Sequence, residues 1–555
     1  MEGWPYISHD PASLAAPRHG ITLYDINGDG NQELITAFGN KLYCFNYIGE
    51  LLPGFPYINS NQLEAFANSP VIGDIDGDGF PEIVADWQNI YGHYSKLIAL
   101  NVDGSMCDGF PIDMANNNSF DQLCLYDMDN DGILEIIIGL SQHYPDILEE
   151  IRIYHGNGQM FPGWPVSNIL TYGIAVGDID NDGEGEVVVS GYERLEQRYD
   201  LFAFENDGTA INGFPVEFTY PPGNNYSRHA PVLFDKDDDG NLEIIQLYEH
   251  DDYYGCVAIL NNSGQMIDPW PLEYNQDAHA GPSIAISSID REKFISFGAV
   301  FFGNSFLVDM NAQIVNGWPF WSGDSSAGNY DQPAIGDIDG DGSLDFIFNY
   351  NMAVRDSLGR RMGRIWALDM YGELLDSFPL WVQGTTFPGG VSFGDVDNDG
   401  NVEMTFFTVD TPPGGRPTNR IFLYKFPGVS YESERFPWPM SCHDPQHTNN
   451  LTFRMPTAIS DDEKTLLPRE VVLSQNYPNP FNAVTTIDYN LNDDARVNLK
   501  IFNILGQEVN VLVDKHQKAG NHSVVWDASE FSSGIYYYKL TGNDISIVKN
   551  MMLMK

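Results

Sequence analysis

The sequence predicts an all-β protein, an eight-bladed β-propeller followed by a small Ig-like β-sandwich. An acidic motif recurs seven times between residues 25 and 403. Most recurrences begin about 50 residues apart, the length of a four-stranded propeller blade. The last part of the chain lacks the motif and alternates apolar and polar residues as strands do.

Composition narrows the classes of function. Lys and Arg number 28 and Asp and Glu number 78, so the net charge is −50. A polyanion repels nucleic acid and anionic lipid, and we therefore expect neither as a partner. Aromatic residues make up 13% of the chain, which is too many for a disordered acidic protein.

The five cysteines are scattered and form no C-x-x-C pair, which predicts free thiols rather than a disulfide framework or a zinc site. No run of 18 apolar residues is present, so we expect no transmembrane segment. The first residues, MEGWPYISHDP, show no signal peptide.

The acidic motif has the form D-x-[DN]-x-D-G-x-x-[DE]. Its copies are DINGDGNQE (25–33), DIDGDGFPE (74–82), DMDNDGILE (127–135), DIDNDGEGE (178–186), DKDDDGNLE (235–243), DIDGDGSLD (337–345) and DVDNDGNVE (395–403). The step of 102 residues from Asp235 to Asp337 spans two repeats. One repeat, 282–330, has therefore lost its motif, and the count becomes eight.

Each repeat follows one pattern. In the second repeat, apolar runs lie at 69–73, 82–85 and 96–104, and a G-[FW]-P element follows at 109–112. Short runs rich in β-branched residues and broken by Gly, Asn and Asp predict four strands. A seven-bladed ring is the alternative, because one terminal repeat could be incomplete.

The two ends of the repeat region resemble each other. Trp4-Pro5 precedes His9-Asp10, and Trp438-Pro439 precedes His443-Asp444 at the same spacing. Both segments read as fourth strands, one more than the acidic repeats require. The N-terminal copy could close the ring, or the chain could be a truncated fragment; we favour the fragment, since a signal peptide is also missing.

The acidic loops have the chemistry of a calcium site. Oxygens at positions 1, 3 and 5, a carbonyl at 7 and an acid at 9 converge on a hard cation when Gly at 6 allows a tight turn. An EF-hand would need Glu at position 12, which is Thr36, Ala85 or Ile138 in the first three loops. The predicted ligands of about seven Ca²⁺ are Asp25, Asn27, Asp29, Asn31, Glu33, Asp74, Asp76, Asp78, Phe80, Glu82, Asp127, Asp129, Asp131, Ile133, Glu135, Asp178, Asp180, Asp182, Glu184, Glu186, Asp235, Asp237, Asp239, Asn241, Glu243, Asp337, Asp339, Asp341, Ser343, Asp345, Asp395, Asp397, Asp399, Asn401 and Glu403.

The motif and its spacing resemble the FG-GAP or VCBS repeat of integrin-α-like propellers, over about residues 1–450. The resemblance implies that calcium joins the first two strands of a blade and is structural. It also implies an adhesive or ligand-binding protein.

The degenerate repeat keeps its apolar runs but has Ile286–Phe294 where the motif would lie. We expect a tight hairpin without a cation. Arg291 and Lys293 are predicted to supply there the positive charge that Ca²⁺ brings elsewhere.

Strand-like runs at 485–491, 497–502, 522–526 and 534–540 predict an antiparallel sandwich. The segments LSQNYPNPFN (473–482), FNILGQ (502–507) and SGIY (533–536) resemble the type IX secretion C-terminal sorting domain. The resemblance implies the type IX machinery as a partner, a Bacteroidetes-type source, and a secreted or outer-membrane surface-attached protein. We expect the propeller at 1–448, a linker at 449–468 and the sorting domain at 469–555.

No H-E-x-x-H, G-x-S-x-G or P-loop motif is present, and no catalytic residue is predicted. Antiparallel order places the second-to-third strand connections opposite the acidic loops. They are rich in aromatic and basic residues and predict a face for a protein or glycan ligand. Its residues are Tyr91, His93, Tyr94, His143, Tyr144, Tyr192, Tyr199, Tyr248, His250, Tyr253, Tyr254, Arg355, Arg360, Arg361 and Arg364.

Two other functions stay open. Rhamnogalacturonan lyases resemble this chain in being calcium-bearing eight-bladed propellers, which implies a metal site or basic residues lining a central cleft. The chain could also be the scaffold portion of a larger surface enzyme.

Overall fold

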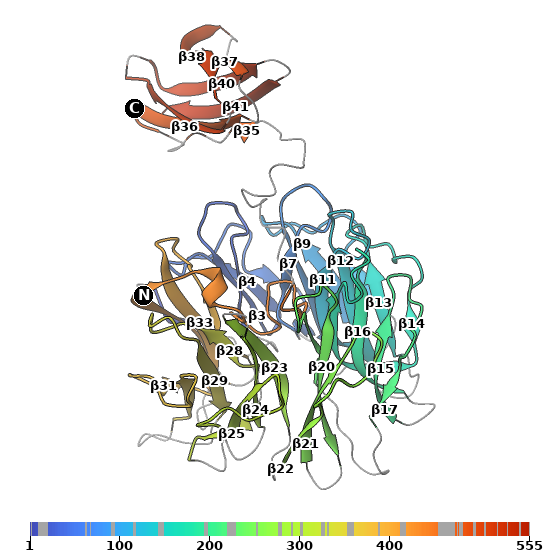
Figure 1. The fold of residues 1–555 in the computed structure, drawn as a ribbon. Helices are drawn as coiled ribbons and strands as arrows, with labels where there is room; N and C mark the ends of the chain where they lie inside the picture. Colours follow the sequence, from blue (N-terminus) through green and yellow to red (C-terminus); the bar gives the residue numbers. More distant parts are fainter. Residues whose placement is uncertain are drawn as a thin grey trace. The chain divides into compact units, whose positions relative to one another are not determined.

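The structure is a computed structural model of all 555 residues, which form two compact units, Met1–Phe453 and Arg454–Lys555 (Figure 1). It describes all residues except 2, 9–19, 62–63, 67, 90–94, 115–117, 143–148, 194–197, 219–228, 251–253, 276–279, 290–291, 300–303, 324–327, 330–331, 352–359, 387–388, 411–417, 453–471, 474–475, 477–480, 492–494, 504–506, 519, 530, 543–544 and 554–555.

The first unit is built from eight antiparallel sheets, and in most of them strands that follow one another in the sequence lie side by side. The first sheet holds β2 (Thr22–Tyr24), β3 (Glu33–Phe38), β4 (Lys41–Phe45) and β5 (Tyr57–Ile58). The second holds β6 (Glu64–Phe66) and β7 (Val71–Gly73), both paired with β8 (Glu82–Asn89), followed by β9 (Ser95–Leu100) and β10 (Ile112–Met114). The third holds β11 (Asn118–Tyr126), β12 (Glu135–Gln142), β13 (Glu150–Tyr154) and β14 (Val166–Ser167).

The fourth sheet holds β15 (Ile169–Gly177), β16 (Glu186–Glu193), β17 (Arg198–Phe204) and β18 (Val216–Glu217). The fifth holds β19 (Val232–Phe234), β20 (Glu243–His250), β21 (Tyr254–Leu260) and β22 (Leu272–Asn275). The sixth holds β23 (Ala280–Ile289), β24 (Glu292–Ala299), β25 (Asn304–Asp309) and β26 (Phe320–Trp321). The seventh sheet holds β27 (Gly328–Asn329) and β28 (Ala334–Gly336), both paired with β29 (Asp345–Asn351), followed by β30 (Met362–Leu368) and β31 (Leu380–Gln383). The eighth holds β32 (Ser392–Gly394), β33 (Asn401–Asp410), β34 (Thr418–Ser430) and β1 (Tyr6–Ser8).

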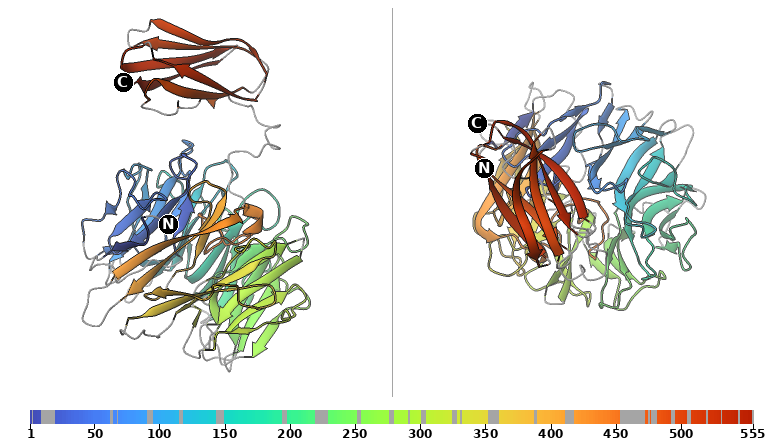
Figure 2. Two further views of the ribbon diagram at one scale, coloured as in Figure 1. Left: turned by 90° about the vertical axis from the view of Figure 1, so that its left-hand side faces the viewer. Right: turned by 90° about the horizontal axis from the view of Figure 1, so that it is seen from above.

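The sheets are arranged around a common axis as the blades of a propeller (Figure 2). Every sheet packs against a neighbour on both faces, so its middle strands are apolar on both sides. Val187, Val188 and Val189 of β16, for example, are all fully buried. This explains why these strands read as continuous β-branched runs rather than alternating ones.

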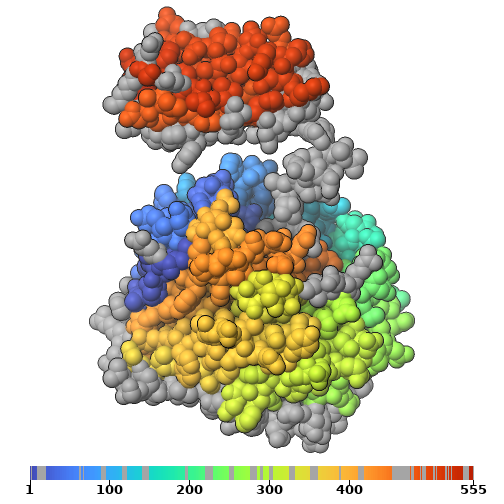
Figure 3. Space-filling model, turned by 60° about the vertical axis from the view of Figure 1, so that its left-hand side comes forward, coloured from blue at the N-terminus to red at the C-terminus, as the bar shows by residue number. Residues whose placement is uncertain are grey.

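Strand β1 closes the ring. It pairs with β34 in the register Ile7↔Arg420, so the start of the chain supplies the outer strand of the last sheet. That sheet lies against the first one: Leu23 and Phe38 share a core cluster with Phe407 and Ile421. Figure 3 shows the first sheet in blue beside the last one in orange. The N-terminal Trp-Pro segment therefore leads into the strand that closes the ring, one of the roles that the sequence left open.

The second Trp-Pro segment is not a fourth strand, contrary to our expectation. Residues 435–451, here called the axial segment, contact the innermost strands of six sheets. Backbone N–H groups of Ile72, Leu125, Val176, Leu233, Ile335 and Phe393 donate to carbonyl oxygens of Pro445, Gln446, Thr448, Asn449, Trp438 and Pro439, at 2.8–3.0 Å. Because innermost strands surround the axis, this segment runs along it. The 3-10 helix η1 (Ser433–Arg435) leads into the segment.

The sheet without an acidic motif keeps its place in the ring. Strands β23 and β24 pair up to Ile289↔Glu292, so only two residues separate them, as expected of a tight hairpin. All five cysteines are free and buried. Among the described residues there is no helix long and apolar enough to cross a membrane.

The second unit is a two-sheet sandwich. One sheet holds β35 (Val472–Leu473), β36 (Val484–Leu491) and β39 (Gly520–Asp527); the other holds β37 (Ala495–Asn503), β38 (Glu508–Gln517), β40 (Gly534–Gly542) and β41 (Ile545–Leu553). Trp526 and Tyr538 fill its core. The N–H of Asn476 donates to the Tyr538 hydroxyl at 2.9 Å, which holds Asn476 against the sandwich. Asn449 and Asn450, expected in the linker, belong to the first unit.

Candidate metal sites in the acidic loops

Each acidic loop joins the innermost strand of its sheet to the second strand. The loop 25–33, for example, begins directly after β2 and ends on Glu33, the first residue of β3. Position 2 of the motif anchors six of the seven loops, because its apolar side chain is buried between sheets. These anchors are Ile26, Ile75, Met128, Ile179, Ile338 and Val396.

Two positions of each loop adopt left-handed backbone conformations. The glycine at position 6 has φ between +83° and +96° in all seven loops, a region that strains any residue with a Cβ atom. Position 4 has φ between +52° and +79° and is always Gly, Asn or Asp, the residues that tolerate this region best. The motif therefore encodes the turn as well as the ligands.

The first aspartate of the motif organises the turn. In the loop 25–33, Asp25 Oδ1 accepts a hydrogen bond from the N–H of Gly28 at 2.8 Å, and Oδ2 accepts one from Gly30 at 2.9 Å. Position 5 does the same for position 7: Asp29 Oδ1 accepts from the N–H of Asn31 at 2.8 Å. These bonds bend the loop back on itself.

The acid at position 9 closes each loop from below. One of its oxygens accepts a hydrogen bond from the N–H of position 2, at 2.7–3.2 Å in all seven loops. Its side chain is buried everywhere; even Glu243, the most accessible, is only 8% exposed. A buried carboxylate next to other carboxylates is costly unless a cation or a proton neutralises it.

The pKa values of these closing acids are raised for the same reason. Burial, assisted by the neighbouring aspartates, raises the pKa of Glu33 and of Glu135 to about 8 and that of Glu186 to about 9. It raises the pKa of Asp345 to about 8 and those of Glu82 and Glu403 to about 7. Without a metal ion, the loops therefore retain protons near neutral pH.

The donor set fits a hard cation. In at least five of the loops, three carboxylates each bring an oxygen within 4.8 Å of the others; one such group is Asp178, Asp180 and Glu186. Oε1 of Glu186 is buried and has no hydrogen-bond partner among the described residues. Several carboxylate oxygens and a backbone carbonyl are ligands that suit Ca²⁺, which takes six to eight oxygens.

Lysine or arginine side chains contact three of the loops, and His155 Nδ1 lies 3.1 Å from Glu135 Oε1 in a fourth. The guanidinium of Arg435 lies 2.8 Å from Asp337 Oδ2, on one ligand of the loop 337–345. Lys293 Nζ lies 2.7 Å from Asp238, which occupies position 4 and is not a predicted ligand. Lys293 thus contacts the loop of the neighbouring sheet, whereas we had expected it to supply positive charge to its own hairpin. Arg291 lies outside the described residues. The third is Lys425, on the loop 395–403.

The predicted ligand face is described only in part. Tyr192 and Tyr199 are cross-strand partners with ring centroids 4.8 Å apart, and Tyr172 lies 5.8 Å from Tyr199. All three are half-buried at the end of the fourth sheet opposite its acidic loop. Arg360 is exposed and Arg361 half-buried, and His250 and Tyr254 lie in β20 and β21. The members outside the described residues are Tyr91, His93, Tyr94, His143, Tyr144, Tyr253 and Arg355.

Two predicted members of this face do not reach its surface. Tyr248 is buried and stacks on Phe218 at 4.6 Å, so it belongs to the core. The guanidinium of Arg364 is enclosed between the rings of Trp366 and Trp381, at 5.3 and 5.0 Å. Both lie inside strands, where alternation and not the adjoining loop decides the direction of a side chain.

Sequence reasoning missed the axial segment, which contributes a row of buried polar groups. Asp444 Oδ1 accepts from the N–H groups of Gln446 and Thr448 at 3.0 and 3.1 Å. His443 Nδ1 lies 3.0 Å from Asp444 Oδ2. The run SCHDPQHTNN (441–450) interrupts the strand pattern and was the available signal.

Two family models match the chain. The FG-GAP-like repeat matches residues 25–85 and 127–189, which include four of the acidic loops. The secretion system C-terminal sorting domain matches residues 475–554, nearly all of the second unit's strands. No curated protein matches the sequence.

Solved structures similar to this chain include the biofilm matrix protein Bap1 of V. cholerae, with 14% identity, a TM-score of 0.40, and coverage of 79% of this chain and 93% of Bap1. The rhamnogalacturonan lyase YesW has 13% identity and a TM-score of 0.38, with 74% and 90% covered. PorZ of Porphyromonas gingivalis has 11% identity and a TM-score of 0.26, with 96% and 81% covered. All three are too distant to bear on activity. The eight sheets, the acidic loops and the two family matches lead to one conclusion: the chain carries FG-GAP-like repeats in a β-propeller and ends in a secretion system C-terminal sorting domain.

Proposed function

We propose that the protein is an exported propeller that calcium stabilises and that binds a protein or glycan through the face opposite its acidic loops. The buried acid at position 9 carries the calcium part of this proposal. Seven such acids lie beside further carboxylates, and a polar hairpin that bound nothing would have no reason to bury them. Calcium turns this repulsion into attraction and fixes the first two strands of a blade.

The binding part rests on the aromatic residues at the far end of the sheets. Half-buried Tyr172, Tyr192 and Tyr199 offer ring faces and hydroxyl groups together, which suits a sugar or a protein surface. The axial segment argues for binding rather than lyase chemistry. It occupies the axis with buried residues, where a lyase of this type would need a metal site or basic residues lining a central cleft.

A binding assay with immobilised polysaccharides, rhamnogalacturonan among them, tests this face. The double variant Tyr192→Ala, Tyr199→Ala should lose the binding that the wild type shows. Tyr371→Ala is the matched control, because Tyr371 is 69% exposed in a turn at the acidic-loop end. Release of unsaturated oligosaccharides from the polymer would instead establish a lyase.

Export is tested in a host with the type IX machinery. Removal of residues 549–555 takes away the second half of β41, including the buried Met551 and Leu553. The truncated protein should stay in the periplasm, whereas Met552→Ser, on the exposed face of the same strand, should reach the surface. Surface delivery of the truncated protein would refute the sorting role.

A further inference from the structure

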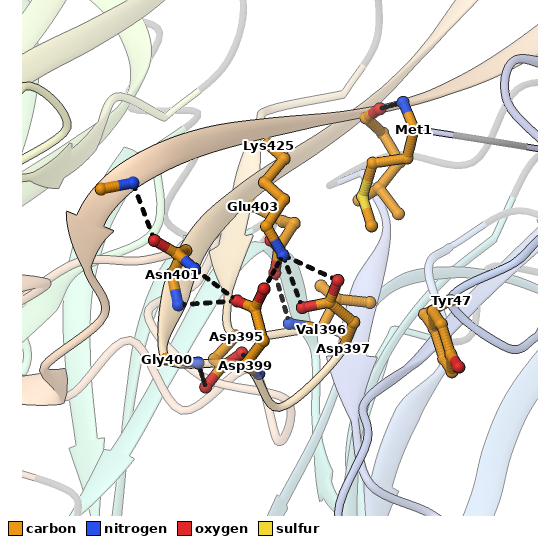
Figure 4. Close-up of polar contacts among 12 residues, drawn as sticks. Met1, Tyr47, Asp395, Val396, Asp397, Asp399, Gly400, Asn401, Glu403 and Lys425 are labelled. Atoms are coloured by element: carbon orange, nitrogen blue, oxygen red, sulfur yellow. Dashed lines mark hydrogen bonds and ion pairs between the residues drawn. The ribbon is translucent and has the colours of Figure 1, made fainter.

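Lys425 occupies the position in the loop 395–403 that a metal ion would take. It lies on β34 directly opposite Glu403. Its Nζ lies 2.7 Å from Asp397 Oδ2, 2.5 Å from Asp399 Oδ2 and 3.2 Å from Glu403 Oε1 (Figure 4). These are the acids at positions 3, 5 and 9 of the motif. One ammonium group therefore touches three of the four carboxylates that the sequence assigns to calcium.

No other loop has a lysine or an arginine at the corresponding place. The registers of the second and third strands place Asn46, Asn101 and Asn261 opposite the closing acids of three loops. His155, Glu205 and Asp369 stand there in three more. Glu205 and Asp369 would add negative charge to their loops, whereas Lys425 removes it.

The other basic contacts are of a different kind. Arg435 touches a single ligand, Asp337, and Lys293 touches the non-ligand Asp238. Neither binds several ligands of one loop at once. Lys425 does: its ammonium group donates hydrogen bonds to both carboxylate oxygens of Asp397 and to Oδ2 of Asp399, and it forms an ion pair with Glu403 Oε1.

A second cation in this loop would lie within a few ångströms of the ammonium. At that separation, two like charges in a partly buried site repel by several kcal/mol. Calcium would also need the oxygens that the ammonium already binds. To admit the ion, Lys425 would have to leave the loop and expose three carboxylates.

We propose that the loop 395–403 takes no Ca²⁺ and that Lys425 is its built-in cation, so that the propeller carries six calcium ions and not seven. The proposal rests on the proposed calcium binding of the other six loops. This loop borders the seam where the last sheet meets the first: the N–H of Gln32 donates to the carbonyl of Val396 at 3.0 Å. The last sheet would thus need no calcium on its side of the seam.

Calcium stoichiometry by equilibrium dialysis of the full chain tests this. The wild type should bind six ions, and Lys425→Met should bind seven. Asp397→Asn should leave the count at six, because its loop holds no ion, whereas the equivalent Asp180→Asn in the loop 178–186 should lower it to five. Lys41→Met is the control, because Lys41 begins β4, the third strand of its sheet, at the end away from the acidic loop. This variant should bind six ions.

Thermal melting in chelator is the second measurement. Lys425→Met should melt at a lower temperature than the wild type there, because the three acids lose their cation, and added calcium should remove the difference. Seven ions in the wild type, with a loss in Asp397→Asn, would overturn the role of Lys425 while leaving the calcium proposal intact. A count of zero in every variant would overturn both.

Discussion

The backbone N–H of Leu125, on the innermost strand β11, donates a hydrogen bond to the carbonyl oxygen of Gln446 at 2.9 Å. The two residues are more than 300 positions apart in the chain, and five equivalent bonds link the axial segment to other sheets. Innermost strands would otherwise present some backbone groups to the axis. The axial segment pairs with them and ties six sheets to one stretch of chain.

Replacement of Asp444 tests the contribution of this segment. Asp444→Ala removes the acceptor of two buried N–H groups and leaves them unsatisfied, which should lower the free energy of unfolding by about 3 kcal/mol. Urea unfolding in excess calcium measures the effect. Asp113→Ala is the control, because that side chain is 78% exposed, and its cost should stay within about 0.5 kcal/mol. Equal effects of the two changes would contradict a structural role for the segment.

Closure of the ring by β1 predicts a contrast between adjacent residues. The Tyr6 ring packs on Phe45 with centroids 4.6 Å apart, whereas Ile7 points outwards and is 44% exposed. Tyr6→Ala should cost about 1–3 kcal/mol and Ile7→Ala less than about 0.5 kcal/mol. The midpoint of denaturant unfolding measures both. A larger loss for Ile7→Ala would mean that β1 lies in the other register.

The effect of Glu186→Gln on the melting temperature should have opposite signs with and without calcium. In calcium, Glu186→Gln removes a ligand and should lower the melting temperature. In chelator at pH 8, the same change removes a carboxylate that is costly to ionise and should raise the melting temperature above that of the wild type, since Gln still accepts the hydrogen bond from Ile179. Glu50→Gln, at an exposed turn, should have neither effect. Loss of stability in both conditions would contradict the metal role of Glu186.

The metal-free protein should become less stable as the pH rises. Burial raises the pKa of Glu33 and Glu135 to about 8, from an ordinary value of 4.5. Between those two values the folded chain binds protons that the unfolded chain has released, so stability is full below about pH 4.5 and is lost as the pH rises through about 8. Each group contributes a slope of at most about 1.4 kcal/mol per pH unit.

Melting in chelator from pH 5 to pH 9 measures this slope. Calcium should flatten it, because the ion displaces the protons. A metal-free protein whose stability is constant over this range would show that the closing acids are not buried as described.

The sequence by itself determined the repeat, the blade pattern, the turn of each acidic loop and the sorting domain. These features are local: a left-handed glycine at position 6, an apolar anchor at position 2 and four short strands follow one another within about 50 residues. The spacing even located the sheet that has no motif, β23 to β26, because its neighbours need their faces covered.

Only the tertiary structure decided which Trp-Pro segment closes the ring and which turns away from its outer edge. Trp4-Pro5 leads into β1, whereas Trp438-Pro439 lies in the axial segment, although their sequences are alike. The ring offers an edge for pairing at β34 and a single axis. In the same way, Lys425 meets Glu403, 22 positions earlier in the chain, because strands β33 and β34 pair in this register. No motif records that contact, since it depends on strand register and on the direction of a side chain in the folded sheet.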